Sequence, residues 1–190
     1  MNTNKQNNIY EFDFTNNEND YLLQYKTFGV IIWLTGLSGA GKSSIANELN
    51  KLLNQKKYLS IILDGDSIRK GLSSDLDFSE NGRLENIRRV AETAKLISLS
   101  GIIPICALIS PLQKYRKLAR EIIGNNFIEC YVDTPLEICK QRDYKKIYSS
   151  GFDFGYEAPI EPEIILNTFN MTAKQYAWKI FEYLNNNKIV

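Results

Sequence analysis

The sequence contains no histidine, and this absence restricts the available chemistry more than any other feature. Acid–base catalysis near neutral pH must therefore use a carboxylate, a lysine, a tyrosine or a cysteine. Only three cysteines occur, Cys106, Cys130 and Cys139, an odd number without the spacing of a metal site. Cys106 and Cys130 lie in apolar runs, so we expect buried free thiols in a reducing, cytoplasmic environment.

A charge imbalance and long apolar runs are also missing. The 23 basic and 22 acidic residues give a net charge of +1, which argues against broad binding to nucleic acid or to an acidic membrane. No apolar run has the length of a membrane span, and the first residues lack the apolar core of a signal peptide. The 190 residues suit one soluble domain. We therefore predict small-molecule partners, with no nucleic acid and no membrane.

The chain divides into a short arm and one domain. Residues 1–27 are rich in asparagine and charge without a clean period, which predicts a partly flexible N-terminal arm. Over residues 28–190, short apolar runs alternate with amphipathic stretches. The predicted strands are 30–34, 59–63, 102–108, 127–132 and 164–166, and the predicted helices are 43–55, 82–99, 112–123, 135–141 and 173–185. This alternation predicts an α/β fold in which helices flank a parallel five-stranded sheet.

The segment between the first predicted strand and helix matches the pattern G-x-x-x-x-G-K-[ST] at every fixed position. This phosphate loop consists of Gly36, Leu37, Ser38, Gly39, Ala40, Gly41, Lys42 and Ser43, and Ser44 follows it in the helix. Such a loop directs backbone N–H groups at a polyphosphate, so we predict a P-loop NTPase fold that binds ATP through these nine residues. Lys42 is expected to contact the β- and γ-phosphates from a surface position, and Ser43 to ligate Mg²⁺.

Two carboxylates, Asp64 and Asp66, flank a glycine directly after the second predicted strand. Ligands of parallel sheets bind beyond the carboxyl ends of the strands, so these carboxylates are expected to face the phosphate loop. An acidic turn without function is the alternative on spacing alone. Because the chain has no histidine, a carboxylate at this place is a candidate general base.

The predicted helix at residues 82–99 carries several arginines. Arg83 and Asn86 lie three residues apart and share a helix face, and an arginine beside a phosphate loop suits recognition of phosphate or sulfate. For Arg88 and Arg89 the alternative is a solvated basic face that is paired with nearby glutamates.

Taken together, these blocks resemble the successive motifs of the adenylylsulfate kinase family, in the order of that family, from about Gly29 to Thr168. The segments that carry the resemblance are residues 36–43, 64–66, 77–79, 83–89, 108–111, 132–136, 142–143 and 156–159. The resemblance implies an ATP-dependent kinase that phosphorylates the ribose 3′-hydroxyl of adenylylsulfate, with Mg²⁺ as cofactor. It also implies a homodimer and a role in sulfate assimilation.

The resemblance assigns roles to individual residues. Asp66 matches the carboxylate that accepts the proton of the substrate hydroxyl, Asp64 matches its companion near the metal, and Lys42 completes the catalytic set. Arg142 matches a residue near the ATP adenine. The positions that match acceptor-binding residues are Arg69, Phe78 (the stacking aromatic), Arg83, Asn86, Ile109 and Ser110 (also a candidate phosphate contact).

The sequence departs from the family in the lid, residues 144–155, which is shorter than usual and lacks the family's context for the second aromatic that sandwiches the acceptor base. Phe152 and Phe154 are the nearest candidates to replace that aromatic. A short lid fits a changed acceptor, so a kinase for cytidine diphosphoramidate in capsule biosynthesis is the alternative function. A non-catalytic nucleotide-binding regulator is the alternative from another class, and the retained Asp66 argues against it.

Overall fold

The computed structural model describes residues 29–143, 146, 148, 155–168 and 171–190. The predicted N-terminal arm, residues 1–27, lies outside the described residues, as does most of the lid with Phe152 and Phe154.

Five strands form one parallel sheet in the order β2-β3-β1-β4-β5. Their bounds are β1 Ile31–Thr35, β2 Ser60–Asp64, β3 Ile103–Ala107, β4 Phe127–Asp133 and β5 Ile164–Asn167. The helices are α2 Lys42–Gln55, α3 Gly65–Lys70, α4 Glu80–Ser98, α5 Gln113–Ile123, α6 Leu136–Gln141 and α7 Ala173–Asn186, with a 3₁₀ turn η1 at Gly124–Asn126. The predicted fold class is confirmed, and the ten predicted elements are present with ends shifted by at most two residues.

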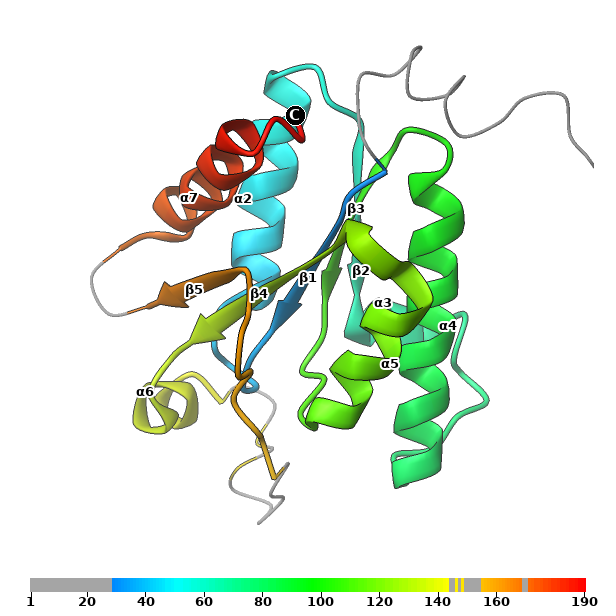
Figure 1. Cartoon of the computed structure of the whole chain (residues 1–190). Helices are drawn as coiled ribbons and strands as arrows, with labels where there is room; N and C mark the ends of the chain where they lie inside the picture. Colours follow the sequence, from blue (N-terminus) through cyan, green and yellow to red (C-terminus); the bar gives the residue numbers. More distant parts are fainter. Residues whose placement is uncertain (1–28, 144–145, 147, 149–154, 169–170) are drawn as a thin grey trace, which may run out of the picture.

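The helices cover both faces of the sheet (Figure 1). On one face α2 and α7 pack against each other, and on the other face α4 packs against α5. The fully apolar sequence of β1 follows from this arrangement, because Ile32 and Leu34 join the core under α2 and α7 while Ile31 and Trp33 join the core under α4 and α5. A parallel strand buried on both faces needs apolar residues at every position.

The helix α3 is the one described helix that the sequence pattern did not predict. It has only six residues, too few to show a helical period, and it begins directly at the end of β2. The Asp64 side chain caps it by accepting hydrogen bonds from the backbone N–H groups of Asp66, at 3.1 Å, and Ser67, at 3.4 Å. The expected acidic turn is therefore the first turn of a helix, because the cap satisfies its free N–H groups.

The three cysteines are buried free thiols, as predicted. Desolvation raises the pKa of each thiol above its usual range. The thiolate form, which is the reactive one, is thereby disfavoured.

Candidate active site

A cleft of about 630 Å³ lies at the carboxyl ends of the strands, where the phosphate loop, α3, the start of α4 and the loop after β3 meet. It brings together all the predicted site residues except Gly36 and Leu37, which do not line it. The lining therefore includes Ser38, Gly39, Ala40, Gly41, Lys42, Ser43, Ser44, Asp64, Asp66, Arg69, Phe78, Arg83, Asn86, Ile109, Ser110 and Arg142.

Two glycines explain how the phosphate loop packs against the sheet. Gly36 has a φ of 150°, and a Cβ atom there would lie 2.6 Å from the carbonyl oxygen of Val132. Gly39 has a φ of 78°, and its Cβ would lie 2.8 Å from the carbonyl oxygen of Cys139. Gly36 is a fixed position of the motif, whereas Gly39 is not. Glycine is needed at position 39 because the loop passes directly over α6, which leaves no room for a Cβ atom.

Lys42 is the first residue of α2, and its Nζ donates hydrogen bonds to the carbonyl oxygens of Gly36, at 2.9 Å, and Leu37, at 2.7 Å. Only 8% of the residue is exposed, so the expected surface position is wrong. Because the helix begins with Lys42 itself, the ammonium group of this residue lies against the loop carbonyls. A cation held at this place faces the cleft in which phosphates are expected.

Ser43 and Asp64 connect the phosphate loop to the end of β2. The Ser43 hydroxyl donates a hydrogen bond of 2.8 Å to Oδ2 of Asp64, while Oδ1 of Asp64 caps α3. Asp66 lies in the first turn of α3 and lines the same cleft. Hydroxyl and carboxylate oxygens are the ligands that Mg²⁺ prefers, so this pair fits the predicted metal position.

The predicted acceptor side of the cleft is aromatic and positively charged. Phe78 is 70% exposed, and the guanidinium carbons of Arg69 and Arg83 lie 4.6 Å and 6.0 Å from its ring centre. Burial lowers the pKa of Arg69, and the positive charge of Arg83 lowers it further. Two guanidinium groups beside one aromatic ring suit an anionic ligand, which relieves their repulsion.

Two other predicted acceptor residues are more buried. Asn86 is 6% exposed, and in the part of the chain that the structure describes its Oδ1 has no hydrogen-bond partner. Ser110 has a left-handed φ of 37°, and its hydroxyl accepts from Trp33 Nε1 and donates to Thr35. The Ser110 hydroxyl is thus engaged within the protein at the edge of the cleft.

The alternative for the remaining arginines of α4 is confirmed. Arg88 pairs with Glu85 at 2.8 Å, and Arg89 pairs with both Glu85, at 3.0 Å, and Asp75, at 2.6 Å. Neither arginine lines the cleft.

Sequence reasoning missed the wall that the start of α7 contributes to the cleft, which consists of Met171, Thr172, Ala173 and Tyr176 together with Thr168. One signal was available, because Thr172 and Gln175 form a capping box and so mark a helix start at this edge of the sheet. Their place beside the phosphate loop depends on long-range contacts that no local pattern reveals. An example is Thr134, whose hydroxyl donates a 2.9 Å hydrogen bond to the carbonyl of Ala40 in the phosphate loop and also contacts the hydroxyl of Thr168.

Comparison with known proteins identifies the family. Residues 28–167 match the family model described as Adenylylsulphate kinase. This chain belongs to the adenylylsulfate kinase family. It is 42% identical to the adenylyl-sulfate kinase of Clostridium acetobutylicum over the whole of both chains. It is 46% identical to that of Clostridium kluyveri over 83% of this chain and 84% of the relative.

Solved structures of the adenylylsulfate kinase family agree with this assignment. The APS kinase of Mycobacterium tuberculosis, solved in complex with AMPPNP and APS, has a TM-score of 0.79 at 35% identity. That match covers 83% of this chain and 98% of the other. Among the residues that the structure describes, none of the helices has the length and apolar character needed to cross a bilayer.

Proposed function

We propose that this chain transfers the γ-phosphoryl group of ATP to the ribose 3′-hydroxyl of adenylylsulfate, giving 3′-phosphoadenylylsulfate and ADP. The observation that carries the proposal is that a single cleft holds the phosphate loop, two strand-end carboxylates and an arginine-flanked aromatic. The names of the relatives, which match up to the full length of the chain, support adenylylsulfate as the acceptor.

The ATP half of the reaction depends on the phosphate loop. Its backbone N–H groups and the N-terminus of α2 hold the phosphates, and Lys42 offsets the charge that develops on the transferring group. Lys42 can exchange its bonds to two loop carbonyls for bonds to phosphate oxygens held by the same loop. Arg142 lines the cleft after α6, where we place the adenine.

Magnesium is part of this proposal, with the Ser43 hydroxyl as a ligand and Asp64 as the adjacent carboxylate. Bound there, Mg²⁺ would offset the negative charge of the β- and γ-phosphates. The 2.8 Å hydrogen bond between the two side chains supports this assignment, because it places both oxygens side by side next to the loop.

Asp66 is proposed as the general base. The 3′-hydroxyl gives its proton to the Asp66 carboxylate as its oxygen forms a bond to the γ-phosphorus. The bond between that phosphorus and the β–γ bridging oxygen breaks, and ADP leaves with the electron pair. Asp64 and Asp66 are carboxylates that line the cleft of a chain without histidine, and the oxygens of Asp64 already bind Ser43 and the first turn of α3, so Asp66 is the stronger candidate.

Phe78 is proposed to stack on the base of the acceptor, with Arg69 and Arg83 attracting its phosphosulfate. Base–aromatic stacking contributes roughly 1–3 kcal/mol per base in single-stranded nucleic-acid complexes. The opposite face of the base would be covered from the lid, which lies mostly outside the described residues.

A product assay tests the function. Purified protein is given ATP, Mg²⁺ and either adenylylsulfate or cytidine diphosphoramidate, and the products are separated and checked for a 3′-phosphate. We expect turnover of adenylylsulfate with a kcat/KM at least about tenfold above the cytidyl acceptor, which corresponds to 1.4 kcal/mol or more. Preference for the cytidyl acceptor would favour the capsule alternative, and no turnover of either acceptor would favour a regulator.

The homodimer and the cytoplasmic location stay predictions that the family resemblance and the composition support. Sedimentation velocity at micromolar concentration measures the first. A mass near 21.8 kDa, that of one chain, would contradict a homodimer.

A further inference from the structure

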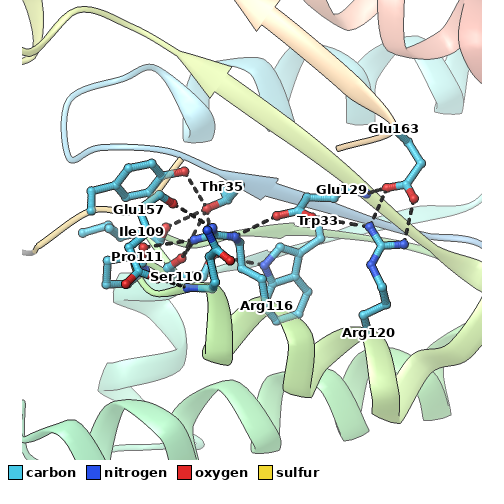
Figure 2. Close-up of polar contacts among 12 residues, drawn as sticks. Trp33, Thr35, Ile109, Ser110, Pro111, Arg116, Arg120, Glu129, Glu157 and Glu163 are labelled. Carbon is cyan, nitrogen blue, oxygen red and sulfur yellow. Dashed lines mark hydrogen bonds and ion pairs between the residues drawn. The ribbon is translucent and has the colours of Figure 1, made fainter. Parts of the chain in front are cut away.

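Arg116 is a buried arginine on α5 that does not line the cleft, and only 4% of its side chain is exposed. Figure 2 shows its guanidinium among four partners. Nη1 donates to the carbonyl oxygens of Ser110, at 2.7 Å, and Pro111, at 3.0 Å. Nη2 donates to the carbonyl of Glu157 at 2.7 Å, and Nε forms an ion pair of 2.8 Å with Glu129 on β4.

The first segment that Arg116 holds is the acceptor loop, residues 109–111. Ser110 adopts a left-handed backbone that residues other than glycine rarely take, and such a conformation persists only where the surroundings fix it. Arg116 fixes the carbonyls on one side of this loop, and Thr35 fixes the other side through a 2.8 Å bond to the carbonyl of Ile109. The planar guanidinium carries several N–H donors, so one side chain can bind the carbonyls of successive residues.

The second segment is the chain that returns from the lid. Glu157 donates its backbone N–H to the carbonyl of Pro111 at 2.9 Å, and its carboxylate accepts from the backbone N–H of Gln113 at 2.6 Å. The Tyr156 hydroxyl lies 3.0 Å from that of Thr35, the last residue of β1 before the phosphate loop. The acceptor loop and the chain after the lid are therefore joined to each other and, through Thr35, to the root of the phosphate loop (Figure 2).

A buried guanidinium is tolerated only with a counter-charge, and Glu129 supplies it. Burial raises the pKa of Glu129, and the positive charge of Arg116 acts against that rise. Arg120 lies one turn further along α5 and also contacts Glu129, at 3.4 Å, but its main partner is Glu163. Arg120 thus shares the helix and the counter-charge of Arg116 without sharing its bonds to the acceptor loop.

We propose that Arg116 is a positioning residue for the acceptor, which holds residues 109–111 and the returning chain at Tyr156 and Glu157 as one unit against β4. The inference rests on the proposed function, because it assigns residues 109–111 to the acceptor side. It predicts that loss of the Arg116 fork weakens acceptor binding while ATP binding through the phosphate loop is preserved.

The kinetic test compares Arg116→Lys with the matched control Arg120→Lys. Lysine keeps the charge opposite Glu129 but has one nitrogen, which cannot bind three carbonyls that are set around a planar fork. For Arg116→Lys we expect the KM for adenylylsulfate to rise at least about tenfold, as for loss of charge-assisted hydrogen bonds, with the KM for ATP changed less than about twofold. For Arg120→Lys we expect both KM values within about twofold of the parent, since it makes no bond to the loop.

A spectroscopic test does not depend on activity. Trp33 is buried and donates its indole N–H to Ser110 at 3.1 Å, while Trp178, the only other tryptophan, is half exposed. In a Trp178→Phe background, fluorescence therefore reports on the contact of Trp33 with the acceptor loop. We expect Arg116→Lys to shift the Trp33 emission and Arg120→Lys to leave it unchanged.

The outcomes distinguish the positioning role of Arg116 from the proposed function. If Arg116→Lys changes neither the Trp33 emission nor the ratio of the two KM values, or if Arg120→Lys gives the same split, the positioning role is wrong. If the parent protein does not turn over adenylylsulfate, the proposed function fails, while the Trp33 emission still decides whether Arg116 holds the loop. Should Arg116→Lys fail to fold, Tyr156→Phe removes the hydrogen bond of the returning chain to Thr35, which also binds the Ile109 carbonyl of the acceptor loop, and a smaller split in the same direction is expected. Unchanged KM values and Trp33 emission in Tyr156→Phe would then overturn the proposal.

Discussion

Lys42 is buried and is also proposed to be catalytic. Its replacement should therefore affect both stability and activity. Replacing it with alanine removes the cation proposed to contact the phosphates, and it also removes its hydrogen bonds to the carbonyls of Gly36 and Leu37. The first loss acts on the reaction and the second on the fold.

For Lys42→Ala we expect turnover to fall at least about a hundredfold, as for loss of a preorganised charge. We also expect a decrease of about 1–3 kcal/mol in the free energy of unfolding. Single-turnover phosphoryl transfer and urea unfolding measure the two effects. The control is Lys51→Ala on the same helix, whose exposed side chain pairs with Glu48, and neither quantity should change. Near-normal transfer in Lys42→Ala would refute its assigned role.

Asp66 and Asp64 are two residues apart, yet the structure gives them different surroundings. Asp64 binds Ser43 and caps the first turn of α3, whereas Asp66 lies within that turn and lines the cleft. Asp66→Asn keeps the shape but removes the basicity, so we expect kcat to fall about 10²- to 10⁴-fold with the dissociation constant of ATP nearly unchanged. Asp64→Asn should instead raise the Mg²⁺ concentration needed for half-maximal rate. Equal kcat with weaker ATP binding in Asp66→Asn would reassign Asp66 to the metal or nucleotide contacts.

At the scale of elements, the salt bridges on α4 fasten this helix to the segment that follows α3. Arg89 joins Glu85 of its own helix to Asp75 and also donates to the carbonyl of Leu72 at 2.9 Å. Hydrogen bonds from Arg88 and Arg89 lower the pKa of Glu85 to about 2. A lowered carboxyl pKa adds stability above the usual value of the unfolded chain, and this stability is lost as the pH falls toward the folded value.

Glu85→Gln should therefore lower the melting temperature by about 2 °C at pH 7, the size expected for loss of an exposed ion-pair network. The difference from the parent should shrink as the pH decreases from about 4.5 toward 2, because protonation of Glu85 removes the same interactions in the parent. Differential scanning calorimetry from pH 3 to pH 7 checks this. A difference that stays constant with pH would show that the charge of Glu85 is not the stabilising feature.

The elements also show which structural features a local sequence pattern can predict and which it cannot. Strand and helix positions were predictable because apolar spacing reflects which residues face the core. The helix α3 was not, since six residues contain no full period and its stability comes from the Asp64 cap. The left-handed Ser110 was equally hidden, because Arg116 and Thr35 hold it from sequence positions that no local rule connects.

At the scale of the whole molecule, the sequence predicted a parallel sheet but not its order. Apolar runs indicate that a strand is buried, and they carry no information on its neighbours. The order β2-β3-β1-β4-β5 places the ends of β1, β3 and β4 side by side, so that the phosphate loop and the acceptor loop open into the same cleft. The sequence therefore predicted which residues form the site, whereas their arrangement in space required the structure.

Cys106 on β3, Cys130 on β4 and Cys139 on α6 lie in separate elements, and all three are buried. Cys139 lies directly under the phosphate loop, where its carbonyl approaches Gly39. Burial disfavours the thiolate of each cysteine, so reaction with a thiol reagent requires the structure to open. If the domain opens as one cooperative unit, the three thiols should react together, and bound ATP should protect them equally.

We therefore expect labelling by Ellman's reagent in native buffer to show a single slow phase that accounts for three thiols, the number in the chain. At an ATP concentration of 100 times its dissociation constant, this phase should slow by about a hundredfold, because ATP binds only the folded state. Protein unfolded in guanidinium provides the control and should show three fast thiols. A separate, faster reaction of Cys139 would indicate that α6 opens independently of the sheet. In that case mass spectrometry of the labelled peptides would find Cys139 modified before Cys106 and Cys130.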